Sequence, residues 1–420
     1  MKATLSLVIV ALLGASQVQA ASSPLPTGSQ WGDQNLSPFY RWEQPLPSRP
    51  GVMLREEQMP AQAEVTKAAL AHRILYSSTD VRWHAGIVPV SGSLYLPTGE
   101  PPTGGWPLVA WAHGTLGVAD SCAPSWTGHK PRDATYINRW LESGFAVVAT
   151  DYQGLGGPGP HPYLIWEAEG HSVLDAIRAA LAAHADKLAS KVFITGQSQG
   201  SGAALGATTV ASSYAPDVPL LATVATGLVS TFPMGPYKPA APFKVGSPIY
   251  LTLMLLGGSL PDEAAPVDKL VTDKGKLVLQ AARESCTGEM RTIAQKQDVT
   301  GDNAYVEPIE KVEASIVPPT DMKPARLPVP LLLGTGLADH TLAPLRQYAA
   351  VSALCAAGND VVWKTYPGIT HNGGVNASFP DALAFFRDAL QSRKPQSNNC
   401  ASIAEPAAPT AAAPDIPFND

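Results

Sequence analysis

A serine lies between two glycines at residues 196–200, in the pentapeptide Gly-Gln-Ser-Gln-Gly. The β-branched residues at 192–195 predict a strand that leads into Ser198, and the small residues after it predict a helix. A serine on such a strand–turn–helix is exposed above a sheet, and the flanking glycines allow the backbone to turn sharply there. A purely structural turn is the alternative, which this context disfavours. We therefore predict that Ser198 is a nucleophile.

A serine hydroxyl is a weak nucleophile and needs a base that is held by a third group. On this kind of fold the acid and then the histidine are expected to follow the serine, each after a late strand. Two histidines follow Ser198, His340 and His371. His371 comes after the last predicted strand, and Asp339 comes directly after the strand before it. We predict His371 as the general base and acid, Asp339 as its orienting group, and His340 as a loop residue that points away.

The other candidate acids and histidines are less suitable. Asp360 and Asp381 do not directly follow a predicted strand. Asp151 precedes the serine, so we expect it to anchor a loop, and His113 is expected to be structural. The negative charge that develops on a substrate carbonyl oxygen needs N–H donors. The backbone N–H groups of Gln199, at the start of a helix, and Thr115, after the strand at 108–112, are predicted to supply them.

The alternation of strands and helices from residue 108 onward predicts an α/β fold with a mostly parallel central sheet flanked by helices. Two antiparallel strands precede it. The strand pattern stops between residues 233 and 327, where helices predict a cap inserted after the sixth strand. Residues 21–232 and 328–400 then form the body with an N-terminal arm. The Pro- and Ala-rich residues 401–420 are predicted to be a disordered tail.

The first twenty residues resemble a signal peptide. Lys2 is followed by a short apolar stretch and by Val18-Gln19-Ala20, which is typical of a cleavage site. We predict cleavage near Ala20 and export to the periplasm or the medium. A membrane anchor is the alternative, and the apolar stretch is too short for it.

Composition and motif spacing argue against several classes of protein. The formal net charge is −6 with no basic cluster, which argues against a nucleic-acid partner. The glycines at 154–159 do not fit a dinucleotide loop, so we predict no cofactor. The four cysteines form no metal-ligand motif, and we expect two disulfides and no metal. Their spacing alone leaves three possible pairings.

Together these motifs resemble the secretory lipase family, the lipase A-like group of the α/β-hydrolases. The resemblance runs from about residue 73 to 390 and rests on residues 111–115, 122–124, 151–156, 196–200, 336–339 and 368–371. It implies the α/β-hydrolase fold, a helical lid, and the disulfides Cys122–Cys286 and Cys355–Cys400. It also implies hydrolysis of carboxylic esters, from short-chain esters to triacylglycerols, whereas relatives in plant-associated bacteria look like cell-wall esterases.

We predict a secreted carboxylic-ester hydrolase that acts on a small-molecule or lipid ester, with transient contact to a lipid interface as one option. The alternatives, from the best to the least supported by the sequence, are an esterase for acylated carbohydrates, an amide hydrolase and a non-catalytic binding protein. The cap is rich in charge for a lid that binds oil. Its apolar piece at 249–256 is expected either to line an acyl tunnel or to form the core of the cap. The sequence predicts no oligomeric state.

Overall fold

The computed structural model describes residues 24–60, 65–229, 247–261, 264, 266–316, 322, 325–391 and 398–420. The predicted signal peptide lies outside these residues. No helix in the described part of the chain is long and apolar enough to cross a membrane.

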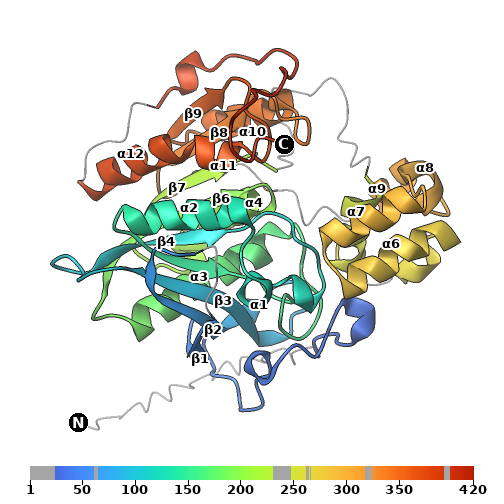
Figure 1. The fold of residues 1–420 in the computed structure, drawn as a ribbon, viewed down its shortest axis with the longest axis horizontal. Helices are drawn as coiled ribbons and strands as arrows, with labels where there is room; N and C mark the ends of the chain where they lie inside the picture. The colour runs from blue at the N-terminus through green and yellow to red at the C-terminus, as the bar shows by residue number, and fades with distance from the viewer. Residues whose placement is uncertain are drawn as a thin grey trace, which may run out of the picture.

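A nine-stranded sheet forms the centre of the molecule, in the order β1-β2-β3-β5-β4-β6-β7-β8-β9 (Figure 1). The first three strands are antiparallel to their neighbours: β1 (Met53–Gln58), β2 (Ala68–Asp80) and β3 (Gly86–Pro97). The other six are parallel to one another: β4 (Trp106–Ala112), β5 (Ala146–Thr150), β6 (Leu188–Gln197), β7 (Leu220–Thr226), β8 (Leu331–Gly336) and β9 (Val361–Tyr366). The predicted α/β-hydrolase architecture with a mostly parallel sheet is thereby confirmed.

One strand was not predicted. β1 lies in the stretch that we expected to be an extended arm, so the cap follows the seventh strand and not the sixth. The sequence of β1, Met-Leu-Arg-Glu-Glu-Gln, has no alternation of apolar and polar residues. It is an edge strand that is only half-buried, and charged side chains are usual at a sheet edge.

Helices cover both faces of the sheet (Figure 1). One face packs against α2 (Pro131–Glu142) and α12 (Phe379–Leu390), through large aromatic side chains such as Trp140 and Phe386. The other face packs against α3 (Trp166–Ala183), α4 (Gln199–Tyr214) and α10 (Pro344–Ala356). Strand β8 illustrates the pattern, because Leu332 packs with the first group of helices while Leu331 and Leu333 pack with the second.

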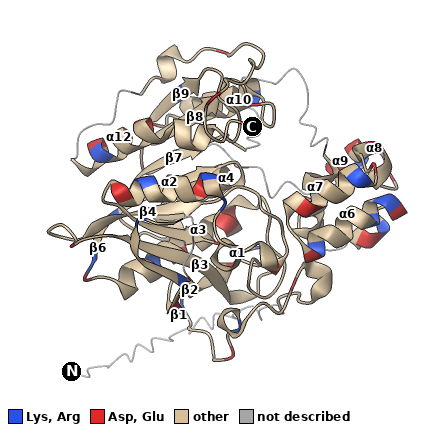
Figure 2. Cartoon of the chain, viewed as in Figure 1, with Lys and Arg blue, Asp and Glu red and all other residues tan. Residues whose placement is uncertain are grey.

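Between β7 and β8 the described chain is helical. The helices are α5 (Pro248–Leu256), α6 (Asp273–Glu284), α7 (Thr287–Lys296), α8 (Gly301–Ala304) and α9 (Ile309–Ser315). Charged residues of the cap gather on helices α6, α7 and α9 (Figure 2). Both ends of the predicted cap, near residues 233 and 327, fall within or close to stretches outside the described residues, so its boundaries stay a prediction.

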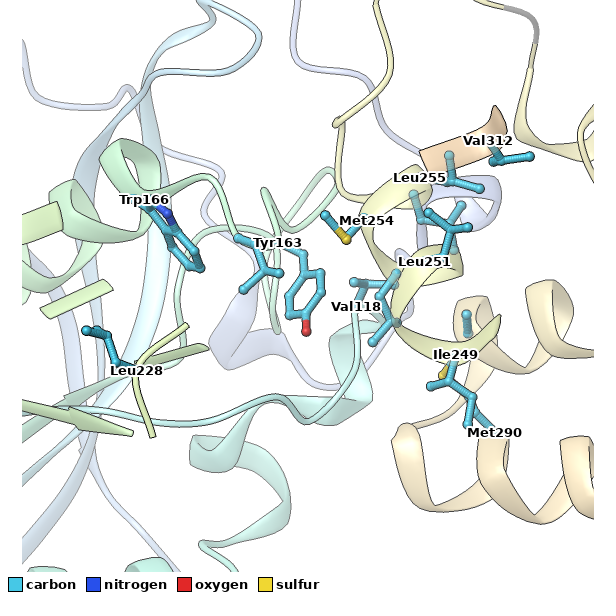
Figure 3. Packing of buried hydrophobic residues seen from close by; sticks show 14 of the residues in the cluster. Val118, Tyr163, Trp166, Leu228, Ile249, Leu251, Met254, Leu255, Met290 and Val312 are labelled. Carbon is cyan, nitrogen blue, oxygen red and sulfur yellow. The ribbon is translucent and has the colours of Figure 1, made fainter. Parts of the chain in front are cut away.

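Helix α5 joins the cap to the body. Its side chains Leu251 and Leu253 are fully buried. In Figure 3, Leu251 and Met254 lie between Val118 and Tyr163 of the body and the other cap helices. The apolar piece that was expected to line an acyl tunnel or to form cap core is therefore mainly core, which fixes the cap to the body through burial of apolar surface.

Two disulfides add to this attachment. Cys122 is bonded to Cys286, which precedes α7, and Cys355 at the end of α10 is bonded to Cys400. These are the pairings that the family resemblance implies. The first bond ties the cap to the segment that follows β4, and the second ties the C-terminal segment to the body.

The prediction of a disordered tail at 401–420 is wrong. This segment follows Cys400 along the body, where the backbone N–H of Thr410 donates to the carbonyl of Leu337 at 2.8 Å. The N–H of Ala413 donates to the carbonyl of Gly368 at 2.7 Å. A Pro- and Ala-rich composition shows that the segment has no core of its own. It does not reveal that loops of the body offer hydrogen-bond partners to an extended chain.

Candidate active site

Ser198 occupies the sharp turn between β6 and α4. Its φ of 56° and ψ of −125° are unfavourable for a residue with a side chain. A Cβ on Gly196 would lie 1.9 Å from the carbonyl oxygen of Gly200, and a Cβ on Gly200 would lie 1.9 Å from the carbonyl oxygen of Ala112. Both glycines are thus required by close backbone contacts. Strain of this kind at a half-buried serine that lines a pocket is a feature of functional turns.

Asp339 and His371 lie together, after β8 and β9 respectively. Nδ1 of His371 is 2.8 Å from Oδ2 of Asp339, and the carboxylate is fully buried. Because parallel strands end at the same edge of the sheet, the loops after β6, β8 and β9 place the three predicted residues close to one another. An imidazole bonded to a carboxylate through Nδ1 has its Nε2 free to accept a proton.

Asp339 is held by several donors. Its Oδ1 accepts the backbone N–H groups of Thr341 and Leu342, at 2.9 and 2.7 Å. The side chain of Gln347 donates from Nε2 to Oδ2 at 2.9 Å. The role of Gln347 is not predictable from local patterns, because the sequence at 344–356 gives no clear signal for the helix that places this residue.

A pocket of about 420 Å³ contains Ser198 and His371 in its lining, together with Thr115. Nε2 of His371 is buried and has no hydrogen-bond partner among the described residues. The serine and the imidazole are therefore neighbours in one pocket that do not hydrogen bond in this structure. Such bonds are often formed only when substrate is bound.

The two predicted oxyanion donors lie on either side of the serine. Gln199 is the first residue of α4, and Thr115 lies in the loop after β4. Neither backbone N–H donates to a backbone carbonyl in the described chain. The hydroxyl of Thr115 is 2.8 Å from the hydroxyl of Tyr163, which holds this loop against the body.

A buried polar cluster lies behind Gln199. Its Nε2 donates to Oε1 of Glu169 at 2.7 Å and is 2.8 Å from Nε2 of His161. Burial lowers the pKa of His161 to about 3 and raises the pKa of Glu169 well above its ordinary value. Neutral His161 accepts from Gln199 through Nε2, because its Nδ1 donates to the carbonyl of Gln153 at 2.9 Å. No local pattern in the sequence indicates this cluster, because its members come from the loop before α3, from α3 itself and from the start of α4.

The competing residues take other positions. His340 is exposed. His113 is buried, with Nδ1 2.7 Å from the carbonyl oxygen of Gly114, and burial lowers its pKa. Asp151 is buried and accepts hydrogen bonds from Ser91 and Ser125. Burial raises the pKa of Asp151 to about 6.

The C-terminal segment also reaches the site. Oδ1 of Asn419 accepts the backbone N–H of Thr370 at 2.7 Å, one residue before His371. Phe418 and Asp420 line the same pocket as Ser198. The tail therefore forms part of the wall of the pocket, which no local pattern in the sequence indicates.

No group of three or more His, Cys, Asp or Glu residues that would hold a metal ion occurs in the part of the chain that the structure describes. The polar groups around Ser198 are instead a carboxylate, an imidazole, backbone amides and cationic side chains. This set is suited to acyl transfer through a serine.

The sheet order, the strained serine turn and the acid and histidine loops define a member of the α/β-hydrolase class. The chain belongs to the secretory lipase family, whose profile matches residues 124–398.

Two curated relatives are similar to it over part of their length. The secreted triacylglycerol lipase LIP5 of Malassezia globosa is 25% identical over 266 residues, which cover 60% of this chain and 55% of that protein. LIP7 of the same species is 25% identical over 275 residues, which cover 62% of this chain and 56% of that protein. The chain thus matches little more than half of the length of these relatives.

Solved structures show the same fold. Candida antarctica lipase A in its closed state aligns with a TM-score of 0.67 and 20% identity, over 90% of this chain and 92% of that one. The rice cell wall degrading esterase LipA from Xanthomonas oryzae aligns with a TM-score of 0.60 and 17% identity, over 82% of this chain and 100% of that one.

Proposed function

We propose that the protein is a secreted serine hydrolase of carboxylic esters, in which Ser198, His371 and Asp339 form the catalytic triad. The observation that carries this proposal is the contact of 2.8 Å between His371 Nδ1 and buried Asp339, in the same pocket as a serine on a strained turn. Family membership and relatives named as secreted lipases support the ester as substrate and export as the route.

The reaction has two halves. Nε2 of His371 takes the hydroxyl proton of Ser198 while the oxygen attacks the ester carbonyl carbon. The N–H groups of Thr115 and Gln199 stabilise the oxyanion. The bond to the alcohol breaks and His371 protonates the departing oxygen, which leaves an acyl-serine. Water then loses a proton to His371 as it attacks the acyl carbon. The bond to Ser198 breaks, His371 returns the proton to the serine oxygen, and the acid is released. Asp339 keeps the imidazole in the required tautomer throughout.

The substitution Ser198→Ala tests the proposal directly. We expect the hydrolysis of p-nitrophenyl butyrate to fall by about 10⁴-fold or more, with an unchanged far-UV circular dichroism spectrum. A fluorophosphonate probe should label the unmodified protein at Ser198 and leave the variant unlabelled. Ester turnover that survives in the alanine variant would remove Ser198 from this role.

A further inference from the structure

Three cationic side chains line the pocket of Ser198: Lys130, Arg132 and Arg291. We call them the cationic wall. Among the described residues that line this pocket, Asp420 is the one acidic residue. The formal net charge of the whole chain is −6, so the positive charge in this pocket is opposite in sign to the net charge of the protein. A pocket for neutral fatty acyl chains has no use for such a lining, because an apolar chain in contact with unpaired cations would desolvate them.

The three cations differ in how far they are already paired. Arg132 donates to Oδ1 of buried Asp133 and to Oδ1 of Asn372, each at 2.7 Å. Arg291 donates to the hydroxyl of Tyr250 at 3.0 Å, which is a neutral partner. The ammonium of Lys130 has no hydrogen bond or ion pair with any described residue. Two of the three cations are therefore available to an anion.

The cations also repel one another. The surrounding protein displaces water from Lys130 and so lowers its pKa, and the charges of Arg132 and Arg291 add to this against the opposing effect of Asp133. Lys130 lines the pocket with part of its side chain still exposed, and it directly precedes the first turn of α2. The N-terminus of this helix adds a partial positive charge at the same place. A bound anion would relieve this repulsion.

We propose that the cationic wall is a subsite for a carboxylate carried by the ester substrate, on either its acid or its alcohol half. This inference rests on the proposed ester hydrolase and names the class of its substrate. Lys130 and Arg291 hold the carboxylate by charge-assisted hydrogen bonds. Arg132, neutralised by Asp133, shapes the wall. Asp420 competes with the substrate, since it is an acidic side chain in the same pocket and is held by Nδ2 of Asn372 at 3.3 Å.

Matched pairs of esters test the subsite. In the first pair, p-nitrophenyl hemisuccinate carries a carboxylate on the acid half and p-nitrophenyl butyrate carries none. In the second pair, 4-carboxyphenyl acetate carries a carboxylate on the alcohol half and phenyl acetate carries none. The readout for each pair is the ratio of kcat/KM for the anionic ester to that for the neutral ester. Raising NaCl from about 0.05 M to about 0.5 M should lower this ratio for one pair, because salt screens exposed charges.

Substitutions that remove either a positive or a negative charge from the pocket should change this ratio in opposite directions. Lys130→Met and Arg291→Gln should each lower the ratio about fivefold, the size expected for a partly exposed charge pair. Asp420→Asn should raise it. Lys296→Met, on the exposed surface of α7 and outside the pocket lining, is the matched control and should leave it unchanged. Thermal unfolding of each variant shows that it is folded.

The outcomes separate the two proposals. The pair of esters that responds identifies the half of the substrate that carries the carboxylate. Ratios that stay constant for both pairs in Lys130→Met, Arg291→Gln and Asp420→Asn, in a protein that still hydrolyses esters through Ser198, overturn the subsite alone. A protein that hydrolyses none of the four esters and is not labelled at Ser198 overturns the proposed function as well.

Discussion

Gln347 and His371 bond to the same oxygen of one carboxylate. Nε2 of Gln347 donates to Oδ2 of Asp339 at 2.9 Å, and Nδ1 of His371 lies 2.8 Å from that atom. Gln347 also donates to the carbonyl of Leu342 at 2.7 Å and accepts from the N–H of Leu228 at 3.2 Å. It therefore links the acid loop to the residues that follow β7. We regard Gln347 as a positioning residue.

Replacing Gln347 by Met keeps the size of the side chain and removes its hydrogen bonds. We expect kcat for p-nitrophenyl butyrate to fall at least about tenfold with little change in KM, because orientation of the imidazole matters most in the transition state. The free energy of unfolding should fall by about 1–3 kcal/mol, since buried partners lose their bonds. The pH profile of kcat should also shift, because Asp339 loses a donor. A variant that loses stability but keeps kcat and its pH profile would show that Gln347 is structural only.

Asn419 braces the loop that carries His371. Its Nδ2 donates to the carbonyls of Gly368 and Ala413 at 2.9 and 2.8 Å, and its Oδ1 accepts from Thr370. Asn419→Ala should speed hydrogen exchange at the amide of Thr370 and lower kcat several-fold. Asn419→Asp keeps the acceptor for Thr370 and should retain more of the protection at this amide than Asn419→Ala. Equal protection of the Thr370 amide in the unmodified protein and Asn419→Ala would mean that the tail does not support the loop.

Gly200 shows how little space the serine turn has. In Gly200→Ala the new Cβ would lie 1.9 Å from the carbonyl oxygen of Ala112, which β4 holds in place. We expect a loss of more than about 4 kcal/mol in the free energy of unfolding, or no folded protein. Gly288→Ala is the control, because a Cβ there meets nothing within 4 Å. Since Gly288 lies in α7, its replacement by Ala should be neutral or slightly stabilising. Denaturant unfolding of both variants measures the contrast.

The raised pKa of Asp120 predicts that the stability of the protein depends on pH. Burial raises its pKa from 3.8 to about 8, and the nearby charge of Asp33 acts in the same direction. The folded protein therefore binds a proton that the unfolded chain has lost between about pH 4 and pH 8, so this residue makes stability fall as pH rises through that window. Asp120→Asn should reduce the loss of Tm between pH 5 and pH 8, as measured by differential scanning calorimetry. An equal loss in both proteins would assign the pH dependence to other groups.

The sequence alone determined the elements around Ser198. A β-branched strand, a Gly-x-Ser-x-Gly turn and a helix of small residues are local signals, each contained within a few residues. The same reasoning predicts Asp339 and His371 as site residues, because a residue directly after a parallel strand lies at the edge of the sheet where ligands bind. Since the loops after parallel strands lie at one edge of the sheet, the order of strands is enough to predict that these three residues lie close together.

The tertiary structure decided everything that depends on contacts between distant segments. Gln347 lies on a helix that local patterns did not predict, and the support of Asn419 for the loop of His371 spans 49 residues between Asn419 and Thr370. Lys130 and Arg291 belong to different units, the body and the cap, and become one wall only when the cap packs on the body. Apolar burial of α5 and the Cys122–Cys286 bond bring these units together. Lys130 and Arg291 follow no periodic pattern in the sequence. They line the same pocket as Ser198 only because the folded cap and body bring them to it.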